Sequence, residues 1–133
     1  MDMKAINPWR WQDALHFAQG VETRGAGRVL YCAGQTSVDP EGRVLHRGDM
    51  AGQLARAFDN LETLLSQAGL TLANVVRLNY YVTDLEAFEG ARDVIVARLG
   101  SLAIKPCGSL LGVARLSHPD LLVELEATAA AEA

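Results

Sequence analysis

The stretch MAGQLARAFDNLETLLSQAG, from Met50 to Gly69, decides the fold because its apolar residues recur at spacings of three and four. Such a stripe is typical of a helix that buries one face. The repeating residues are Met50, Leu54, Phe58, Leu61, Leu65 and Ala68. Asp49 stands where an N-cap is needed, and Gly69 stands where the helix should end. We therefore expect a long amphipathic helix that packs on a sheet.

A strand and a second helix should follow. VVRLNYYV (75–82) alternates along its length, as a strand with two different faces does. Thr83 and Glu86 then have the spacing of a capping box, and Gly100 is placed to end the helix. The apolar face of this second helix is formed by Phe88, Ala91, Ile95 and Leu99. Helices and strands thus alternate in the middle of the chain.

The remaining strands lie toward the two ends of the chain. We expect strands at 16–22 and 29–33, joined by a hairpin turn at RGAGR (24–28), and further strands at 109–115 and 121–128. The order β-β-α-β-α-β-β predicts an α+β domain with both helices on one face of a mixed sheet. The opposite face carries a mixture of Leu, Tyr and Glu, which favours burial against another subunit. An oligomer is therefore expected.

Composition narrows the possible functions. The chain has 133 residues, half of them hydrophobic and only four of them proline, which predicts one compact domain spanning 1–133. The formal net charge is -4, and the basic residues are scattered singly. Nucleic-acid binding depends on clustered cations, so it is not expected.

Cysteine content and hydropathy bear on the compartment. Cys32 and Cys107 lie far apart and form no C-x-x-C pair, which is typical of free thiols in a reducing compartment. Candidate zinc ligands are few, so no metal site is expected. No apolar run reaches the roughly 20 residues that cross a bilayer, and the first residues lack the pattern of a signal peptide. We expect a cytoplasmic protein with no membrane partner.

Three segments together resemble the RidA family, also called YjgF or L-PSP. They are CAGQTSVDPEGRV (32–44), QLARAFDNLETLLSQAGLTLANVVRLNYYVTDLEAF (53–88) and VARLSHPDLLVELEATA (113–129). The resemblance runs from about Phe17 to Ala129 and rests on the order and spacing of these segments. It implies a chorismate-mutase-like fold and a homotrimer that binds small ligands in clefts between subunits. It also implies hydrolysis of reactive enamines and imines to a ketoacid and ammonia, without a cofactor.

The resemblance assigns roles to individual residues. Glu124, the first acid of VELEA, matches the carboxylate that orients the attacking water. Gly34 matches the backbone position that approaches the ligand, and Phe17 replaces the family's usual Tyr in the cleft wall. Each has a structural alternative. Glu124 and its neighbour Glu126 are also suited to an interface, Gly34 to a turn at a strand end, and Phe17 to ordinary core packing.

The loop before VARL departs from the family pattern. PCGS (106–109) is predicted to contact the ligand through Cys107, Gly108 and Ser109. Gly108 stands where the family has the Arg that grips a substrate carboxylate through a bidentate ion pair, and Leu110 stands where the family has a cleft Cys. Lys105 is the nearest upstream cation. Both replacements make the predicted cleft less charged and favour a less charged ligand.

Cys107 and the N-terminal tryptophans have two interpretations each. A nucleophilic Cys107 would need a base or a lowered pKa, and no histidine lies near it in sequence. It is otherwise a bystander, and Cys32 in its apolar strand is a core residue. Trp9 and Trp11 either cap the cleft or pack an N-terminal arm onto the sheet.

The sequence is compatible with two functions. The first is a trimeric enzyme that hydrolyses a small reactive metabolite by activating water near Glu124. The second is a non-catalytic trimer that binds a metabolite for sensing or sequestration, which the missing Arg favours. A ribonuclease, the activity in an older name of the family, conflicts with the acidic charge and the lack of a basic, aromatic surface.

Overall fold

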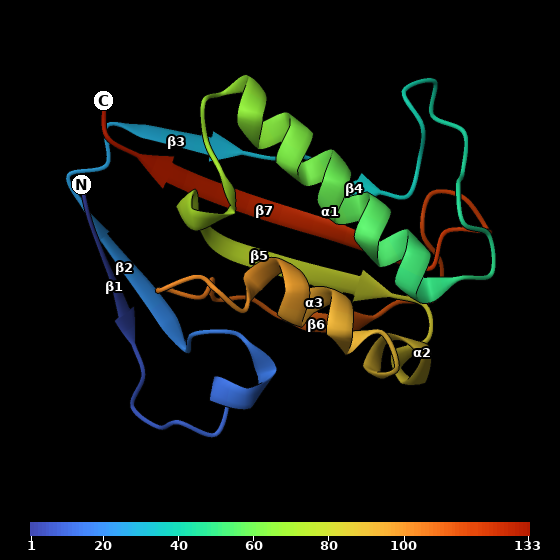
Figure 1. Ribbon diagram of the computed structural model, residues 1–133, viewed down its shortest axis with the longest axis horizontal. Helices are drawn as coiled ribbons and strands as arrows, with labels where there is room; N and C mark the ends of the chain where they lie inside the picture. Colours follow the sequence, from blue (N-terminus) through green and yellow to red (C-terminus); the bar gives the residue numbers. More distant parts are fainter.

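The computed structural model describes residues 1–133 and shows a long helix lying across one face of a mixed sheet (Figure 1). The sheet order is β3-β7-β5-β6, and a short strand, β4, also pairs with β7. Strand β7 runs antiparallel to β3, β4 and β5, whereas β5 and β6 are parallel. The strands of this sheet are β3 (Arg28–Tyr31), β4 (Gln35–Thr36), β5 (Val75–Val82), β6 (Leu110–Gly112) and β7 (Val123–Ala131).

Helix α1 (Met50–Gln67) confirms the prediction from the apolar stripe. The Asp49 carboxylate accepts a hydrogen bond from the backbone N–H of Gly52 at 2.9 Å, so Asp49 is the N-cap. Gly69 adopts a φ of +73° just after the helix, a conformation that glycine takes without strain. The central stripe is fully buried against the sheet and consists of Leu54, Phe58, Leu61 and Leu65.

The second helix is interrupted. Its two pieces are α2 (Leu85–Glu89) and α3 (Arg92–Leu99). The N-cap is Asp84, whose carboxylate accepts from the N–H of Ala87 at 3.0 Å, so the prediction of Thr83 was wrong by one residue. Thr83 instead donates its N–H to the carbonyl of Leu122, which keeps it in the sheet. The predicted apolar positions are nonetheless buried, on the two pieces and at the junction between them: Phe88, Ala91, Ile95 and Leu99.

The N-terminal strands pair differently from the prediction. Strand β2 (Gly20–Arg24) pairs antiparallel with β1 (Asp2–Ile6), and the segment RGAGR connects β2 to β3 without forming a hairpin between them. The sequence prediction missed β1, because five residues are too few to show a reliable period. Part of the strand expected at 16–22 is irregular, and it follows a 3-10 turn, η1 (Asp13–Leu15). A second 3-10 turn, η2 (Leu72–Asn74), leads into β5.

The register of β5 against β7 separates the two faces of the sheet. Tyr80 lies opposite Leu125, and Tyr81 lies opposite Glu124. Because neighbouring residues of a strand point to opposite faces, Tyr80 and Leu125 face the helices while Tyr81 and Glu124 face away from them. We call this second side the open face, since no element of the chain covers it (Figure 1). No helix has the length and apolar character needed to span a bilayer.

Candidate ligand-binding site

Glu124 and Gly34 are in direct contact on the open face. A Cβ built on Gly34 would lie 2.5 Å from the carboxyl carbon of Glu124 and 2.8 Å from its Cγ. Strand β4 starts at the next residue, Gln35, which is paired with Leu125 of β7. Glu124 itself lies opposite Thr36, and its side chain extends two residues back along β4 to the Gly34 backbone. The structure therefore brings together two residues that the family resemblance singled out.

The two carboxylates of β7 have different electrostatic surroundings. Burial raises the pKa of Glu124, and the nearby charge of Glu126 raises that pKa further. Hydrogen bonds from Tyr81 and Asn79 lower the pKa of Glu126. The Tyr81 hydroxyl donates at 2.7 Å and the Asn79 amide at 3.1 Å, both to the same carboxylate oxygen. Two neighbouring carboxyl groups with pKa values pushed in opposite directions are suited to separate acid–base roles.

The Gly108 loop is packed tightly against β5. A Cβ on Gly108 would lie only 2.6 Å from the carbonyl carbon of Leu78. The flanking backbone is part of the sheet: Leu78 N–H donates to the Cys107 carbonyl and Tyr80 N–H donates to the Ser109 carbonyl, both at 2.8 Å. The close contact with Leu78 thus explains why residue 108 is a glycine, and the glycine leaves the loop without the arginine that binds a substrate carboxylate in the family. No side chain, including arginine, fits here without moving the loop.

Cys107 and Lys105 are both held by the fold. The Cys107 sulfur lies 3.2 Å from the carbonyl oxygen of Val76, to which it can donate a weak hydrogen bond. Lys105 donates to the carbonyls of Gly100 and Leu102 just after α3. Neither side chain lines either of the two main pockets of the structure. The Cys107 sulfur therefore points away from the cavity that its neighbours Gly108 and Ser109 line, and Lys105 does not stand in for the missing arginine.

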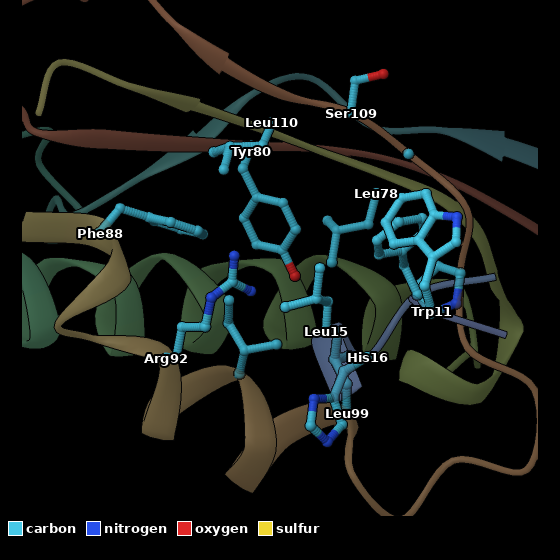
Figure 2. A pocket seen from close by; sticks show the side chains of 14 residues that line it. Trp11, Leu15, His16, Leu78, Tyr80, Phe88, Arg92, Leu99, Ser109 and Leu110 are labelled. Carbon is cyan, nitrogen blue, oxygen red and sulfur yellow. The ribbon is translucent and has the colours of Figure 1, made fainter. Parts of the chain in front are cut away.

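A pocket lies on the helix-covered side of the sheet, and we call it the Tyr80 cavity (Figure 2). Its volume is about 260 Å³. It is enclosed by β5, by α2 and α3, by the loop before β6, and by the segment around η1. Among the predicted ligand residues, Phe17, Gly108, Ser109 and Leu110 line it. Glu124 and Gly34 do not, because they lie on the open face.

The N-terminal segment forms one wall of the Tyr80 cavity. The N–H of Ala18 donates to the carbonyl of Pro106 at 3.1 Å, which brings Phe17 beside the loop before β6. Trp11 meets Phe17 edge to face, with ring centroids 5.8 Å apart and planes at 75°. Phe17 and Trp11 therefore line this cavity, whereas the exposed Trp9 does not, and the roles of Phe17 and Trp11 in a cleft between subunits stay predictions.

The sequence did not predict a ligand-site role for three polar residues that line the cavity: His16, Tyr80 and Arg92. Tyr80 was recognised only as part of an alternating strand, and Arg92 only as a residue of the second helix. The signal available in the sequence was weak, because single Tyr and Arg residues are common in such elements. No group of three or more His, Cys, Asp or Glu side chains is arranged to hold a metal ion.

The fold and the paired carboxylates define a class of small α+β proteins in which helices cover one face of a sheet and two carboxylates lie on the other. The chain belongs to the RidA (YjgF/L-PSP) family, since the model of the family described as Endoribonuclease L-PSP matches residues 10–131. It is 34% identical over 103 residues to the RutC family protein PYRAB12510 of Pyrococcus abyssi, covering 77% of this chain and 79% of that protein.

Two further comparisons relate the chain to a named enzyme and to a solved structure. It is 31% identical over 115 residues to the 2-iminobutanoate/2-iminopropanoate deaminase of Escherichia coli, covering 85% of each protein. The crystal structure of YyfB from Yersinia pestis, described as a protein of unknown function of the conserved Rid family, matches with a TM-score of 0.88. That match has 32% identity and covers 98% of this chain and all of YyfB. The predicted family and fold are confirmed.

Proposed function

We propose that this protein is a homotrimeric hydrolase that acts on small imines or enamines, with Glu124 activating the water. The observation that carries the proposal is the Glu124 carboxylate, which lies against the Gly34 backbone and has a raised pKa next to the ionised Glu126. A carboxylate whose pKa is shifted toward neutrality is an effective general base. The named activity of the Escherichia coli relative supports the same chemistry.

The reaction follows from these groups. Glu124 takes a proton from water as the water oxygen adds to the imine carbon. The carboxyl group then returns that proton to the nitrogen, which gives a carbinolamine. The carboxylate next carries the hydroxyl proton of the carbinolamine to the nitrogen as the C–N bond breaks, and the carbonyl product and ammonia leave. An enamine first takes a proton on carbon to become the imine. Atoms balance as one imine and one water giving one carbonyl compound and one ammonia, so the reaction needs no oxidant.

The open face supports assembly of several chains. Apolar side chains on it remain exposed, among them Tyr31 at 79%, Val29 at 49% and Leu111 at 43%. Exposed apolar side chains gathered on one face of a sheet are typical of subunit interfaces. A second copy over this face would further bury Glu124 and would close a cleft around it.

We expect the substrate of the proposed enzyme to have no carboxylate, because position 108 offers no side chain to bind one. Gly108 has no side chain, and the contact with Leu78 leaves no room for one. A small ketimine or enamine without a carboxylate therefore fits the site better than an iminoacid does. The same observation favours the second candidate, a non-catalytic trimer that binds a metabolite.

The experiment compares Glu124→Gln with Glu126→Gln on two substrates generated in situ, 2-iminobutanoate and a small ketimine without a carboxylate. Ammonia release is the readout. The proposal expects wild type to favour the ketimine and Glu124→Gln to lose about 10²–10⁴-fold in turnover, the usual contribution of a general base. Glu126→Gln should lose much less. Equal turnover by Glu124→Gln and wild type would exclude this assignment.

Sedimentation of the purified protein tests assembly independently of activity. Three chains per particle are expected. Binding of the ketimine by a trimer without ammonia release would identify the non-catalytic candidate. A particle that contains one chain at micromolar concentration would exclude both candidates, because neither has a cleft without neighbouring subunits.

A further inference from the structure

The side chain of Asn79 bridges the Glu126 carboxylate and the loop before β6. Its amide nitrogen donates to a Glu126 oxygen at 3.1 Å, and its amide oxygen accepts from the backbone N–H of Ser109 at 3.0 Å. All three residues belong to the same chain. A side-chain amide that is held at both ends has one orientation, because turning it over would bring donor against donor and acceptor against acceptor.

The Ser109 end of this bridge takes the place of a backbone hydrogen bond. The carbonyl of Ser109 accepts from the N–H of Tyr80 at 2.8 Å, whereas the N–H of Ser109 makes no backbone hydrogen bond and donates to Asn79 instead. Gly108 lies beside the same side chain, since a Cβ built on it would stand 3.3 Å from the Asn79 amide oxygen. The loop and Glu126 are thus linked through one side chain.

A second donor holds the same carboxylate. Tyr81 lies opposite Glu124, and its hydroxyl reaches diagonally to Glu126, where it donates at 2.7 Å to the oxygen that Asn79 also contacts. Asn79 and Tyr81 are two residues apart on β5, so both side chains point to the open face. Glu126 is exposed in the single chain, and an exposed carboxylate without donors would move freely in water. Two donors from one strand fix its position instead.

The pKa values of this group depend on the same contacts. Hydrogen bonds from Tyr81 and Asn79 lower the pKa of Glu126. Burial raises the pKa of Glu124, and the charge of Glu126 raises it further. The hydrogen bond to Glu126 raises the pKa of Tyr81, so the hydroxyl keeps its proton and remains a donor. Arg77, the only basic residue of β5, shifts the pKa of neither carboxylate.

We infer that Asn79 and Tyr81 are positioning residues, which hold Glu126 as a fixed negative charge beside Glu124 and tie it to the loop before β6. The inference rests on the hydrolysis proposed above and adds two residues to it that need not touch the substrate. A fixed negative charge beside the general base strengthens that base, because it makes the proton on Glu124 harder to remove. Loss of either donor would let Glu126 take up a proton or turn into water.

The first test compares the pH profiles of ammonia release from the small ketimine by wild type, Tyr81→Phe and Asn79→Ala. The acid limb of kcat/KM reports the ionisation of the essential base in the free enzyme. This limb should move to lower pH in both variants, by up to about 1 unit, because Glu126 then carries less charge while Glu124 ionises. The titration of the ketimine itself is common to all variants and does not affect the comparison.

The same measurements separate kcat from KM. In both variants kcat on the plateau should fall by less than about 10-fold, because a change of one unit in the pKa of a base changes the rate by at most that factor. KM should stay nearly unchanged, since neither side chain is placed against the substrate. The double variant Tyr81→Phe/Glu126→Gln should shift the acid limb no further than Glu126→Gln alone, as expected if Tyr81 acts through Glu126.

Asn74→Ala is the matched control for a purely structural effect. The side-chain amide of Asn74 is also a bridge on this sheet, since it accepts from the N–H of Thr71 at 3.0 Å and donates to the carbonyl of Ala130 at 3.3 Å. Asn74→Ala should therefore lower stability about as much as Asn79→Ala does, while its acid limb stays where it is in wild type. If Asn79→Ala does not fold, Tyr81→Phe, which keeps the ring, still decides the question.

A carbon-13 NMR titration of the carboxyl groups measures the network without substrate. The signals of Glu124 and Glu126 are assigned by their absence in Glu124→Gln and Glu126→Gln. Tyr81→Phe and Asn79→Ala should each raise the pKa of Glu126 and lower that of Glu124. Unchanged pKa values of both carboxyl groups in the two variants would overturn the inference.

The inference and the proposed function fail in different ways. Wild-type turnover by Glu124→Gln would exclude the proposed hydrolysis and, with it, a role of Asn79 and Tyr81 in that reaction. Loss of turnover in Glu124→Gln, together with an unmoved acid limb in Tyr81→Phe and Asn79→Ala, would overturn the inference and leave the hydrolysis in place. An equal shift of the acid limb in Asn74→Ala would do the same.

Discussion

Gly108 lies so close to Leu78 that a Cβ on the glycine would stand 2.6 Å from the leucine carbonyl carbon. Real Cβ atoms do not approach backbone this closely, so the contact excludes every other residue type in this loop conformation. The position that carries the substrate-gripping arginine in the family pattern is therefore closed to a side chain here.

Gly108→Arg is expected to destabilise the protein by about 1–3 kcal/mol, the usual cost of overpacking. It is not expected to create activity on iminoacids, because the loop must move away from β5 to hold the side chain. Urea unfolding and ammonia release from 2-iminobutanoate measure the two effects. Ser109→Arg is the control, since Ser109 is exposed and a side chain there should cost little. Unchanged stability of Gly108→Arg would show that the loop adapts freely.

Gly34→Ala is expected to displace the Glu124 carboxylate and to reduce turnover nearly as far as Glu124→Gln does. Its effect on stability should be small, since a flexible side chain can move away from the new methyl group. Initial rates and thermal unfolding separate these effects. The double variant Gly34→Ala/Glu124→Gln should lose no more than Glu124→Gln alone, as expected of residues that act together. Additive losses would show that Gly34 acts independently of Glu124.

Glu124 should make stability fall as the pH rises. Its pKa is higher in the folded chain than the ordinary value of about 4.3, so the folded state holds more protons between the two values. The free energy of unfolding therefore decreases as the pH passes upward through this window. Glu124→Gln removes the effect, so its Tm relative to wild type should be higher at about pH 7 than at about pH 4. A difference in Tm that does not change with pH would contradict the raised pKa.

Asp49→Ala is expected to cost about 1 kcal/mol, because it removes the carboxylate that accepts from the N–H of Gly52 at the start of α1. Urea unfolding monitored by circular dichroism measures the change. Glu41→Ala, at an exposed turn, is the control and should be close to neutral. An equal effect of the two substitutions would show that the cap contributes nothing measurable.

Cys107→Ala is expected to leave turnover unchanged. The sulfur lies beside the carbonyl of Val76 within the sheet and does not line either pocket, so a nucleophilic role has no geometric basis. Alkylation by iodoacetamide combined with ammonia release checks this. If activity fell in parallel with alkylation of the Cys107 thiol, the prediction would be wrong and a nucleophilic role for Cys107 would be supported.

Local sequence patterns predicted much of the fold, as the strand at 75–82 and the start of the second helix illustrate. The strand at 75–82 was predicted with its correct limits, because eight alternating residues show their period without help from the rest of the chain. The sequence predicts Thr83 as the cap in place of Asp84, since only the hydrogen bond from Thr83 to Leu122 shows that the sheet continues through Thr83. Element ends depend on such distant partners.

The sequence alone predicted the family, the long helix α1 and the two central strands of the sheet, β5 and β7. Each of these is encoded by the spacing of residues that are close together in the chain. Only the tertiary structure decided that Glu124 meets Gly34 on one face while Phe17 and Leu110 line a cavity on the other. Tyr80 and Arg92 likewise share that cavity only once β5 and the second helix have packed together. These relationships depend on strand register, in which a shift of one residue would exchange the two faces.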